Sequence, residues 1–322
     1  MPRALIFGGA GQDGILLSQF LLSMDYDVHC VVRVQSVAGE RLPLEAPGVV
    51  VHRADLTDAQ QICALVQSVS PSEVYNLAAE SSVAASWKTP TRTMTTNALG
   101  TVHLLEAIRV ASDAGHTMRF YHASSSEMFG RTQTVPQVET TRFEPVSPYA
   151  VSKVAAHHMV TTYREAFDLY SVCGILYNHE SHYRPASFVT RKITSTVAKI
   201  KLGLESTLQL GTLDVSRDWG YAGDYVRAMW LMLQQDQAQD YIIATGVLRP
   251  LEEFVAVAFA AAGIQDWRDR VQTDLSLRRP TEVAALVGEA SKAQTNLGCK
   301  PDVSFEDMIG GMVKHDLMEL GG

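Results

Sequence analysis

A glycine-rich turn constrains the fold of this chain more than any other feature of its sequence. Residues 4–7 form a short apolar run, glycines follow at positions 8, 11 and 14, and residues 13–24 have the apolar spacing of a helix. Glycine lets backbone amides approach a pyrophosphate closely, and the start of a helix stabilises negative charge. The turn therefore predicts a dinucleotide site that includes Gly8, Gly11, Gln12, Asp13 and Gly14.

Short apolar segments alternate with amphipathic ones over the first half of the chain. We expect further strands over residues 28–32, 49–52, 73–77, 119–122 and 172–176. We expect helices between them over residues 59–69, 97–111 and 148–167. This alternation predicts an α/β fold with a doubly wound parallel sheet that is covered by helices on both faces.

The alternation loosens after residue 178. Helical spacing continues over residues 189–202, 224–235 and 251–262, but loops that contain glycine and arginine separate these segments. We therefore expect a smaller C-terminal substrate domain that is interleaved with the sheet. The predicted cofactor domain has residues 1–178 plus about 218–246, and the predicted substrate domain has residues 179–217 and 247–322.

The charge balance and the cysteines limit the compartment and the partners. The 27 Lys and Arg residues against 35 Asp and Glu residues give a net charge of −8, which provides no basic surface for nucleic acid or an anionic membrane. No apolar run approaches the roughly 18 residues that span a bilayer. The first residues enter the glycine turn without the pattern of a signal peptide, and four cysteines are scattered singly. We expect a cytoplasmic protein with no metal site.

The end of the second predicted strand bears on the choice of cofactor. NAD-binding proteins usually place an acidic residue there, whereas this chain has Arg33. An arginine suits the additional phosphate of NADP, and no carboxylate stands at this position to repel it. The alternative is a solvated arginine at a strand end. Asp55, which follows the third strand, is a candidate for hydrogen bonding to the adenine.

Tyr149 and Lys153 form the most reactive pair in the sequence. They are four residues apart in a predicted helix, so both side chains leave the same helical face. An ammonium group beside a phenol favours the phenolate, and we expect the tyrosine pKa to fall from about 10 towards neutrality. Such a tyrosine can accept a hydroxyl proton while hydride leaves the adjacent carbon.

A carboxylate follows a cluster of serines at the end of the predicted strand 119–122. Ser124, Ser125 and Ser126 lie where open α/β sheets bind ligands, and Glu127 comes directly after them. If Glu127 faces the substrate, it can move a second proton, which a simple alcohol dehydrogenase does not need. The alternative is a helix-capping or surface carboxylate.

At this point the residues carry a family resemblance. The glycine turn together with Tyr149 and Lys153 resembles the extended short-chain dehydrogenase/reductase superfamily, and longer strings resemble the GDP-mannose 4,6-dehydratases. These strings are Gly11-Gln12-Asp13-Gly14, Tyr75-Asn76-Leu77-Ala78-Ala79, Ser147-Pro148-Tyr149-Ala150, Asn178-His179-Glu180-Ser181, Phe188-Val189-Thr190-Arg191-Lys192 and Arg217-Asp218-Trp219-Gly220. The similarity runs almost from end to end.

The resemblance implies an internal redox dehydration with bound NADP. Tyr149 would deprotonate the sugar 4-hydroxyl, Ser125 would bond the 4-oxygen, and Glu127 would move a proton from C5 to the departing 6-hydroxyl. The implied cofactor residues are Gly8, Gly11, Gln12, Asp13, Gly14, Arg33, Asp55, Leu56, Leu77, Ala78, Ala79, Tyr149 and Lys153. The implied substrate residues are Ser81, Asn178, Arg184, Val189, Lys192, Arg217, Arg279 and Glu282. Relatives also imply a homodimer or homotetramer.

Three departures from the family pattern leave alternatives open. Residues 182–186 differ from the usual loop, a single arginine follows the second strand, and Glu80 stands where glutamine is usual. Because residues 182–186 are atypical, another GDP-sugar, such as GDP-manno-heptose, is an alternative substrate. A nucleotide-sugar 4-reductase or epimerase, and a dinucleotide-binding sensor without catalysis, are further alternatives.

Overall fold

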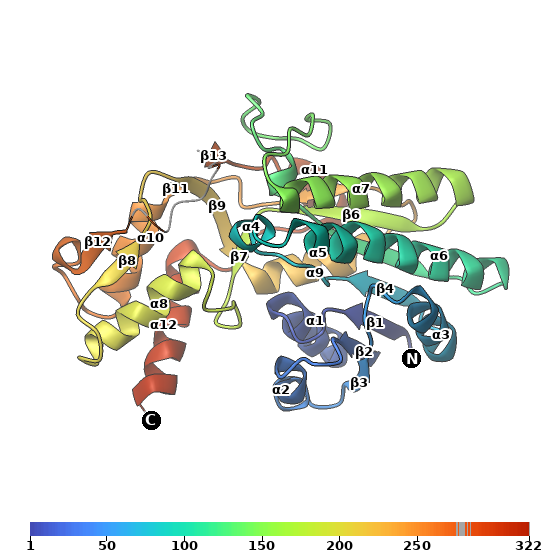
Figure 1. Ribbon diagram of the computed structural model, residues 1–322, viewed down its shortest axis with the longest axis horizontal. Coiled ribbons are helices and arrows are strands. Elements are labelled where there is room, and N and C mark those ends of the chain that lie inside the picture. The colour runs from blue at the N-terminus through green and yellow to red at the C-terminus, as the bar shows by residue number, and fades with distance from the viewer. Residues whose placement is uncertain (275, 277–280, 282, 284, 322) are drawn as a thin grey trace.

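A seven-stranded parallel sheet forms the centre of the larger lobe (Figure 1). This computed structural model describes residues 1–274, 276, 281, 283 and 285–321. The strands occur in the order β10-β6-β5-β4-β1-β2-β3, and neighbouring strands run parallel. Their bounds are β1 Arg3–Phe7, β2 Asp27–Val32, β3 Val50–Arg53, β4 Glu73–Asn76, β5 Arg119–Ser125, β6 Ser171–Leu176 and β10 Tyr241–Ile243. The predicted doubly wound α/β fold is confirmed.

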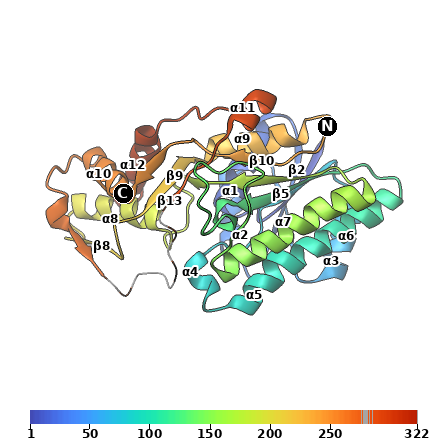
Figure 2. The same cartoon turned by 90° about the horizontal axis from the view of Figure 1, so that it is seen from above.

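Helices cover both faces of this sheet (Figure 2). One buried cluster packs the sheet against α1 (Gln12–Ser23), α2 (Ala38–Glu45), α9 (Ala222–Leu233) and α11 (Ser291–Leu297). A second cluster on the opposite face packs it against α3 (Ala59–Val69), α6 (Gly100–Asp113) and α7 (Pro148–Phe167). Burial on both faces explains why the strands read as continuous apolar runs rather than alternating ones.

The start of α7 is fixed by local sequence chemistry. Ser147 caps the helix, because its hydroxyl oxygen accepts a 3.1 Å hydrogen bond from the backbone N–H of Ala150. Pro148 occupies the first helical position, where a missing N–H costs nothing. Tyr149 is therefore held in the first turn, and Lys153 follows one turn later.

The smaller lobe is built around its own buried core, which includes Ile193, Trp219, Phe254 and Ile309. Helices α8 (Val189–Lys201), α10 (Leu251–Ala261) and α12 (Phe305–Gly321) pack on a sheet of β7 (Asn178–Glu180), β9 (Ser216–Tyr221), β11 (Leu248–Pro250) and β13 (Ala285–Leu286). A separate pair joins β8 (Leu208–Leu210) to β12 (Val271–Thr273). The chain enters this lobe at β7, and α9 and β10 then pack against the larger sheet.

Several short elements were not expected from the sequence. They are α2, α4 (Val83–Ser86), α5 (Pro90–Met94), and the single-turn helices η2 (Ser126–Met128) and η3 (Arg268–Arg270). The helix expected from residue 97 becomes α-helical only at Gly100, because residues 97–99 belong to a π-helical turn, η1 (Thr95–Leu99). Within the ranges that the structure describes, none of the helices combines the length and apolar character that a bilayer crossing requires.

Candidate active site

A cavity of about 700 Å³ lies between the two lobes. Its walls include residues that follow β1, β2, β4, β5 and β6, so it opens at the carboxyl ends of the parallel strands. The chain order of the sheet reverses between β1 and β4, and open α/β sheets bind ligands at such a switch point. Residues from α8 and β9 close the cavity from the smaller lobe.

Most of the predicted site residues line this cavity. Those brought together are Gly8, Gly11, Gln12, Asp13, Arg33, Leu56, Leu77, Ala78, Ala79, Ser81, Ser125, Glu127, Tyr149, Lys153, Asn178, Arg184, Val189, Lys192 and Arg217. Gly14 and Asp55 are described residues that lie off the lining. Arg279 and Glu282 lie outside the described residues. The cavity thus joins the predicted cofactor, catalytic and substrate residues.

Close backbone approach explains two of the glycines. Gly8 has a φ of +84°, and a Cβ there would lie 2.8 Å from the backbone nitrogen of Ala78. A Cβ on Gly14 would lie 2.4 Å from the carbonyl oxygen of Gly8. A side chain at Gly8 would therefore push the turn away from the segment after β4, and one at Gly14 would push α1 away from the turn. The resulting cradle of bare backbone at a helix start fits a dinucleotide pyrophosphate.

The predicted catalytic residues meet on one wall of the cavity. Ser125 ends β5, and its side chain shares a hydrogen bond with the phenol of Tyr149. Lys153 Nζ donates a 2.7 Å hydrogen bond to the carbonyl oxygen of Ala123 and lies 6.0 Å from the centre of the Tyr149 ring. The lysine is thus anchored to the same strand that presents the serine.

The acidities of this pair differ from the sequence-based prediction. Burial raises the pKa of Tyr149 to about 12, and the nearby Glu127 adds to the rise, while Ser125 and Arg184 oppose it. Burial lowers the pKa of Lys153 to about 8. The expectation that Lys153 brings the tyrosine pKa towards neutrality is therefore wrong for this arrangement. Desolvation disfavours the charged form of both groups, and it is the largest cause of each shift.

Glu127 faces the reacting end of the cavity rather than acting as a cap. The cap of η2 is Ser125, whose hydroxyl oxygen accepts a 3.3 Å hydrogen bond from the backbone N–H of Glu127. The Glu127 side chain lines the cavity, and its charge is felt at the Tyr149 phenol. A carboxylate and a phenol are thus available to one bound ligand.

A buried network beside the glycine turn was missed by sequence reasoning. Nε2 of His179 lies 2.9 Å from Oδ2 of Asp13, and Gln12 Nε2 donates to both Asp13 and the His179 carbonyl at 3.0 Å. The His179 ring stacks on Tyr225, with 4.6 Å between ring centres. The network joins the start of α1 to β7. The sequence singled out both of its parts, as the strings of residues 11–14 and 178–181, but it gave His179 no role and did not join the two.

A second buried ion pair supports the wall that the smaller lobe contributes. Arg184 Nε lies 3.2 Å from Oε2 of Glu180, and the Arg184 guanidinium stacks 3.9 Å from the centre of the Phe188 ring. Thr190 Oγ1 donates a 2.6 Å hydrogen bond to the same glutamate oxygen. Arg184 is therefore held in the cavity close enough to influence the pKa values of Asp13 and Tyr149.

The adenosine end of the cavity contains a carboxylate that the sequence did not place there. Arg33 Nη1 lies 3.1 Å from Oε1 of Glu80, and Arg92 Nη2 lies 2.7 Å from the same oxygen. The position after β2 itself carries no carboxylate, but the loop after β4 brings Glu80 to the end of β2. Asp55 accepts hydrogen bonds from Thr57 at 2.7 and 2.9 Å, and it is not among the residues that line the cavity.

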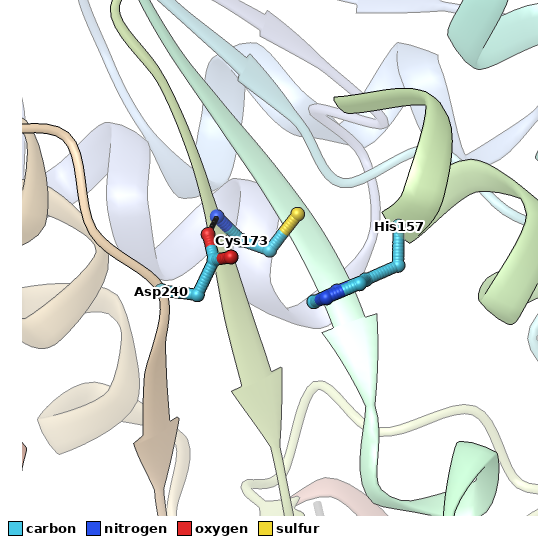
Figure 3. Close-up of side chains that lie close together, drawn as sticks. All are labelled: His157, Cys173 and Asp240. Carbon is cyan, nitrogen blue, oxygen red and sulfur yellow. Dashed lines mark hydrogen bonds between the residues drawn. The ribbon is translucent and has the colours of Figure 1, made fainter. Parts of the chain in front are cut away.

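Three potential metal ligands lie close together next to β5, the strand that ends at Ser125. His157, Cys173 and Asp240 come from α7, β6 and the segment before β10 (Figure 3), and their donor atoms lie within 4.8 Å of one another. The Asp240 carboxylate, however, pairs with Arg164 and accepts the backbone N–H of Cys173. The His157 Nδ1 atom shares a 3.0 Å hydrogen bond with Ser124. Because the Arg164 guanidinium neutralises the Asp240 carboxylate and His157 bonds to Ser124 of β5, we interpret this cluster as a structural contact that holds β5.

Comparisons with known proteins agree with this geometry. A family model described as GDP-mannose 4,6 dehydratase matches residues 5–312. A GDP-mannose 4,6 dehydratase of Arabidopsis thaliana is 47% identical, with 98% of this chain and 87% of the relative covered. The human protein of that name is 40% identical, with 98% and 92% covered.

Solved structures support the same placement. A UDP-glucose 4-epimerase of Thermus thermophilus in complex with NAD has a TM-score of 0.86 at 27% identity, with 98% of each chain covered. A dTDP-glucose 4,6-dehydratase of Streptomyces venezuelae with NAD bound has a TM-score of 0.87 at 25% identity, with 99% and 98% covered. The protein is an enzyme of the hydro-lyase kind, and the chain belongs to the GDP-mannose 4,6-dehydratase family.

Proposed function

We propose that this enzyme converts GDP-mannose into GDP-4-keto-6-deoxymannose with NADP as its cofactor. The observation that carries the proposal is the meeting of Ser125, Glu127 and Tyr149 on one wall of the cavity. A dehydrogenase or epimerase needs the phenol, but a dehydratase also needs a group that moves a second proton. Glu127 meets that additional requirement.

The residues around the glycine turn suit NADP. Gly8, Gly11 and Gly14 leave a bare backbone for the pyrophosphate, and Arg33 stands where a 2′-phosphate would lie. A bound NADP would supply the acceptor for hydride from C4 of the sugar and the donor of hydride to C6. Lys153 lies next to Tyr149 on α7, where an ammonium group can also hold the cofactor ribose.

The first proton transfer belongs to Tyr149. Its phenol oxygen accepts the proton of the sugar 4-hydroxyl, and the Ser125 hydroxyl donates a hydrogen bond that steadies the 4-oxygen. Because burial raises the tyrosine pKa to about 12, the charges that surround a bound ligand have to favour the phenolate. Arg184 already acts in that direction.

The second proton transfer belongs to Glu127. A ketone at C4 acidifies the proton on C5, and the Glu127 carboxylate accepts this proton. The resulting carboxylic acid then protonates the departing 6-hydroxyl, so one side chain serves as base and acid in turn. The carboxylate ends the elimination in the state in which it began. The proton that C5 then needs as C6 gains hydride can come from solvent, and it balances the proton that Tyr149 took from the 4-hydroxyl and releases.

The nucleotide end of the substrate meets the smaller lobe. Lys192 on α8 and Arg217 on β9 line the cavity there and can neutralise the diphosphate. Asn178 at the start of β7 offers hydrogen bonds beside them. Arg279 and Glu282 remain proposed substrate residues, outside the described part of the chain.

Three further predictions, on domain boundaries, oligomeric state and cellular location, remain proposals. The predicted domain boundaries follow the return of the chain from the smaller lobe to the larger sheet at α9 and β10. A homodimer or homotetramer would cover exposed apolar side chains such as Leu99, Val151 and Phe167. A cytoplasmic location agrees with the four unpaired cysteines.

The experiment is a substrate panel read by mass spectrometry. We expect purified enzyme with NADP to convert GDP-mannose into a product lighter by one water, with no net change in the cofactor. Conversion of GDP-manno-heptose alone would identify the other sugar. A product of unchanged mass but inverted C4 would support epimerisation, and an unchanged substrate across the whole panel would reject dehydration.

A further inference from the structure

Arg33 and Glu80 line the adenosine end of the cavity, and Arg92 pairs with the same glutamate. Oε1 of Glu80 contacts Nη1 of Arg33 at 3.1 Å and Nη2 of Arg92 at 2.7 Å. The Asp55 carboxylate lies close enough for both arginines to help lower its pKa, after the larger effect of its hydrogen bonds with Thr57. Two guanidinium groups thus share one carboxylate oxygen of Glu80, and Asp55 is a second carboxylate near them.

Glu80 is the fixed member of this group. Its backbone N–H donates a 2.8 Å hydrogen bond to Oδ1 of Asn97, and Asn97 Nδ2 donates to the Glu80 carbonyl and to Ser152 Oγ. Asn97 is only 1% exposed. The side chains of Arg33 and Arg92 are 69% and 58% exposed, against 25% for Glu80. The arginines can therefore turn towards a bound anion, while the carboxylate stays anchored.

The position of the pair matches one part of the cofactor. In this type of fold, the residue at the end of the second strand meets the adenosine ribose, and an arginine there accommodates a 2′-phosphate. Arg33 follows β2, whereas Arg92 comes from α5 and reaches the same point through Glu80. Two guanidinium groups can hold the oxygens of one phosphate by charge-assisted hydrogen bonds.

We propose that Arg33 and Arg92 together form the 2′-phosphate site, and that Glu80 competes with this phosphate for both arginines. Glu80 thereby sets the preference for NADP over NAD. The inference rests on the proposed use of NADP, and it assigns a role to Arg92 that the spacing of the sequence does not suggest. A carboxylate that neutralises the arginines makes this preference smaller than two arginines alone would give.

The test measures dissociation constants for NADPH and NADH by calorimetry on the purified full chain. We expect Arg92→Gln to weaken NADPH binding by about tenfold, because charge-assisted hydrogen bonds are lost. We expect Glu80→Gln to tighten NADPH binding by about fivefold, because a like charge is removed. NADH, which lacks the phosphate, should change by less than about twofold in both variants.

Matched controls come from an exposed ion pair in the smaller lobe. Arg268 Nη2 lies 2.8 Å from Oε1 of Glu252, so Arg268→Gln and Glu252→Gln remove equivalent charges far from the adenosine end. Both should bind the two cofactors as the unaltered protein does. NADH binding also reports folding, and if Arg92→Gln does not bind NADH, then Arg92→Lys takes its place, with a smaller loss confined to NADPH.

Two results would overturn the inference. One is an equal change in NADPH and NADH binding in the Arg92 variant, which would give that residue a general structural role. The other is unchanged or weaker NADPH binding in Glu80→Gln, which would remove the competition. Turnover of GDP-mannose plays no part in this readout, so failure of the dehydratase assignment and failure of the phosphate site are separate outcomes.

Discussion

Nε2 of His179 lies 2.9 Å from Oδ2 of Asp13, so an ion pair joins the start of the first helix to the first strand of the smaller lobe. Nδ1 of the same ring lies 2.7 Å from the carbonyl oxygen of Tyr177. Both ring nitrogens thus face acceptors, which favours the doubly protonated imidazolium. Burial opposes the charge on each partner, but the attraction leaves the pKa of His179 raised and that of Asp13 lowered.

This pair predicts a pH-dependent part of the stability. The raised pKa of His179 contributes stability that is complete below pH 6.5 and is lost as the pH rises through the folded-state value. The lowered pKa of Asp13 contributes stability above pH 3.8 that is lost as the pH falls. We expect His179→Gln to lower the free energy of unfolding by about 2 kcal/mol between these limits, as measured by urea titration.

The control for this prediction is His116→Gln, which removes an exposed imidazole. It should leave the free energy of unfolding within about 0.5 kcal/mol of the unaltered protein at every pH. The difference between His179→Gln and the unaltered protein should shrink on both sides of the window. A difference that stays constant up to alkaline pH would show that the imidazole contributes by packing on Tyr225 and not by its charge.

The space around two helical glycines predicts opposite changes in the free energy of unfolding when each is replaced by alanine. Gly14→Ala would place a Cβ 2.4 Å from the Gly8 carbonyl oxygen, whereas a Cβ on Gly310 in α12 meets no atom within 4 Å. We expect Gly14→Ala to destabilise the fold by about 2 kcal/mol and to weaken binding of NADPH and NADH alike. Gly310→Ala should raise the free energy of unfolding by up to about 1 kcal/mol.

Urea unfolding measures both substitutions, and cofactor titration separates the two effects. An equal gain in stability for Gly14→Ala and Gly310→Ala would mean that β1 and α1 can move apart without cost. The close approach of Gly14 to Gly8 would then not be required for stability.

The sheet and its main helices could be predicted because each depends on local patterning. Buried parallel strands such as β1 and β6 are continuous apolar runs, and the start of α7 is indicated by the capping residue Ser147 and by Pro148. The short α2 and α5 escaped prediction for other reasons: α2 has a proline inside it, and α5, although it starts at Pro90 after Thr89, has only five residues. The predicted division into two domains stays a prediction.

The composition of the cavity could be predicted better than its electrostatics. The glycine spacing and the motif of residues 149–153 identify which residues belong to the site, and nearly all of the described ones line one cavity. The contacts of Glu80 with Arg33 and of His179 with Asp13 join residues 47 and 166 positions apart, so no local pattern reports them. The raised pKa of Tyr149 likewise depends on burial, which spacing does not measure.

Tyr149→Phe tests the first proton transfer. Removal of the phenol oxygen should lower the turnover of GDP-mannose by at least about 100-fold, because a positioned base typically contributes that much or more. Both formation of the ketone and loss of water should fall together. Cofactor binding should persist, since the ring and Lys153 remain in place. Turnover within a few-fold of the unaltered enzyme would transfer the role of base to another group.

Glu127→Gln separates the second transfer from the first. The amide keeps the size of the side chain and leaves the backbone bond to Ser125 intact, but it cannot accept the C5 proton. We therefore expect a single turnover to accumulate reduced nicotinamide, visible by its near-ultraviolet absorbance, while water release falls by at least about 100-fold. In deuterated water, the unaltered enzyme should place deuterium at C5 and Glu127→Gln should not. Because Glu127 raises the pKa of Tyr149, the variant should also form the ketone at a slightly lower pH.

The control for this prediction is Glu144→Gln, which changes a carboxylate that is not part of the cavity lining. This variant should incorporate deuterium at C5 and dehydrate GDP-mannose as the unaltered enzyme does. Full dehydration by Glu127→Gln would assign the C5 proton to a different side chain of the cavity.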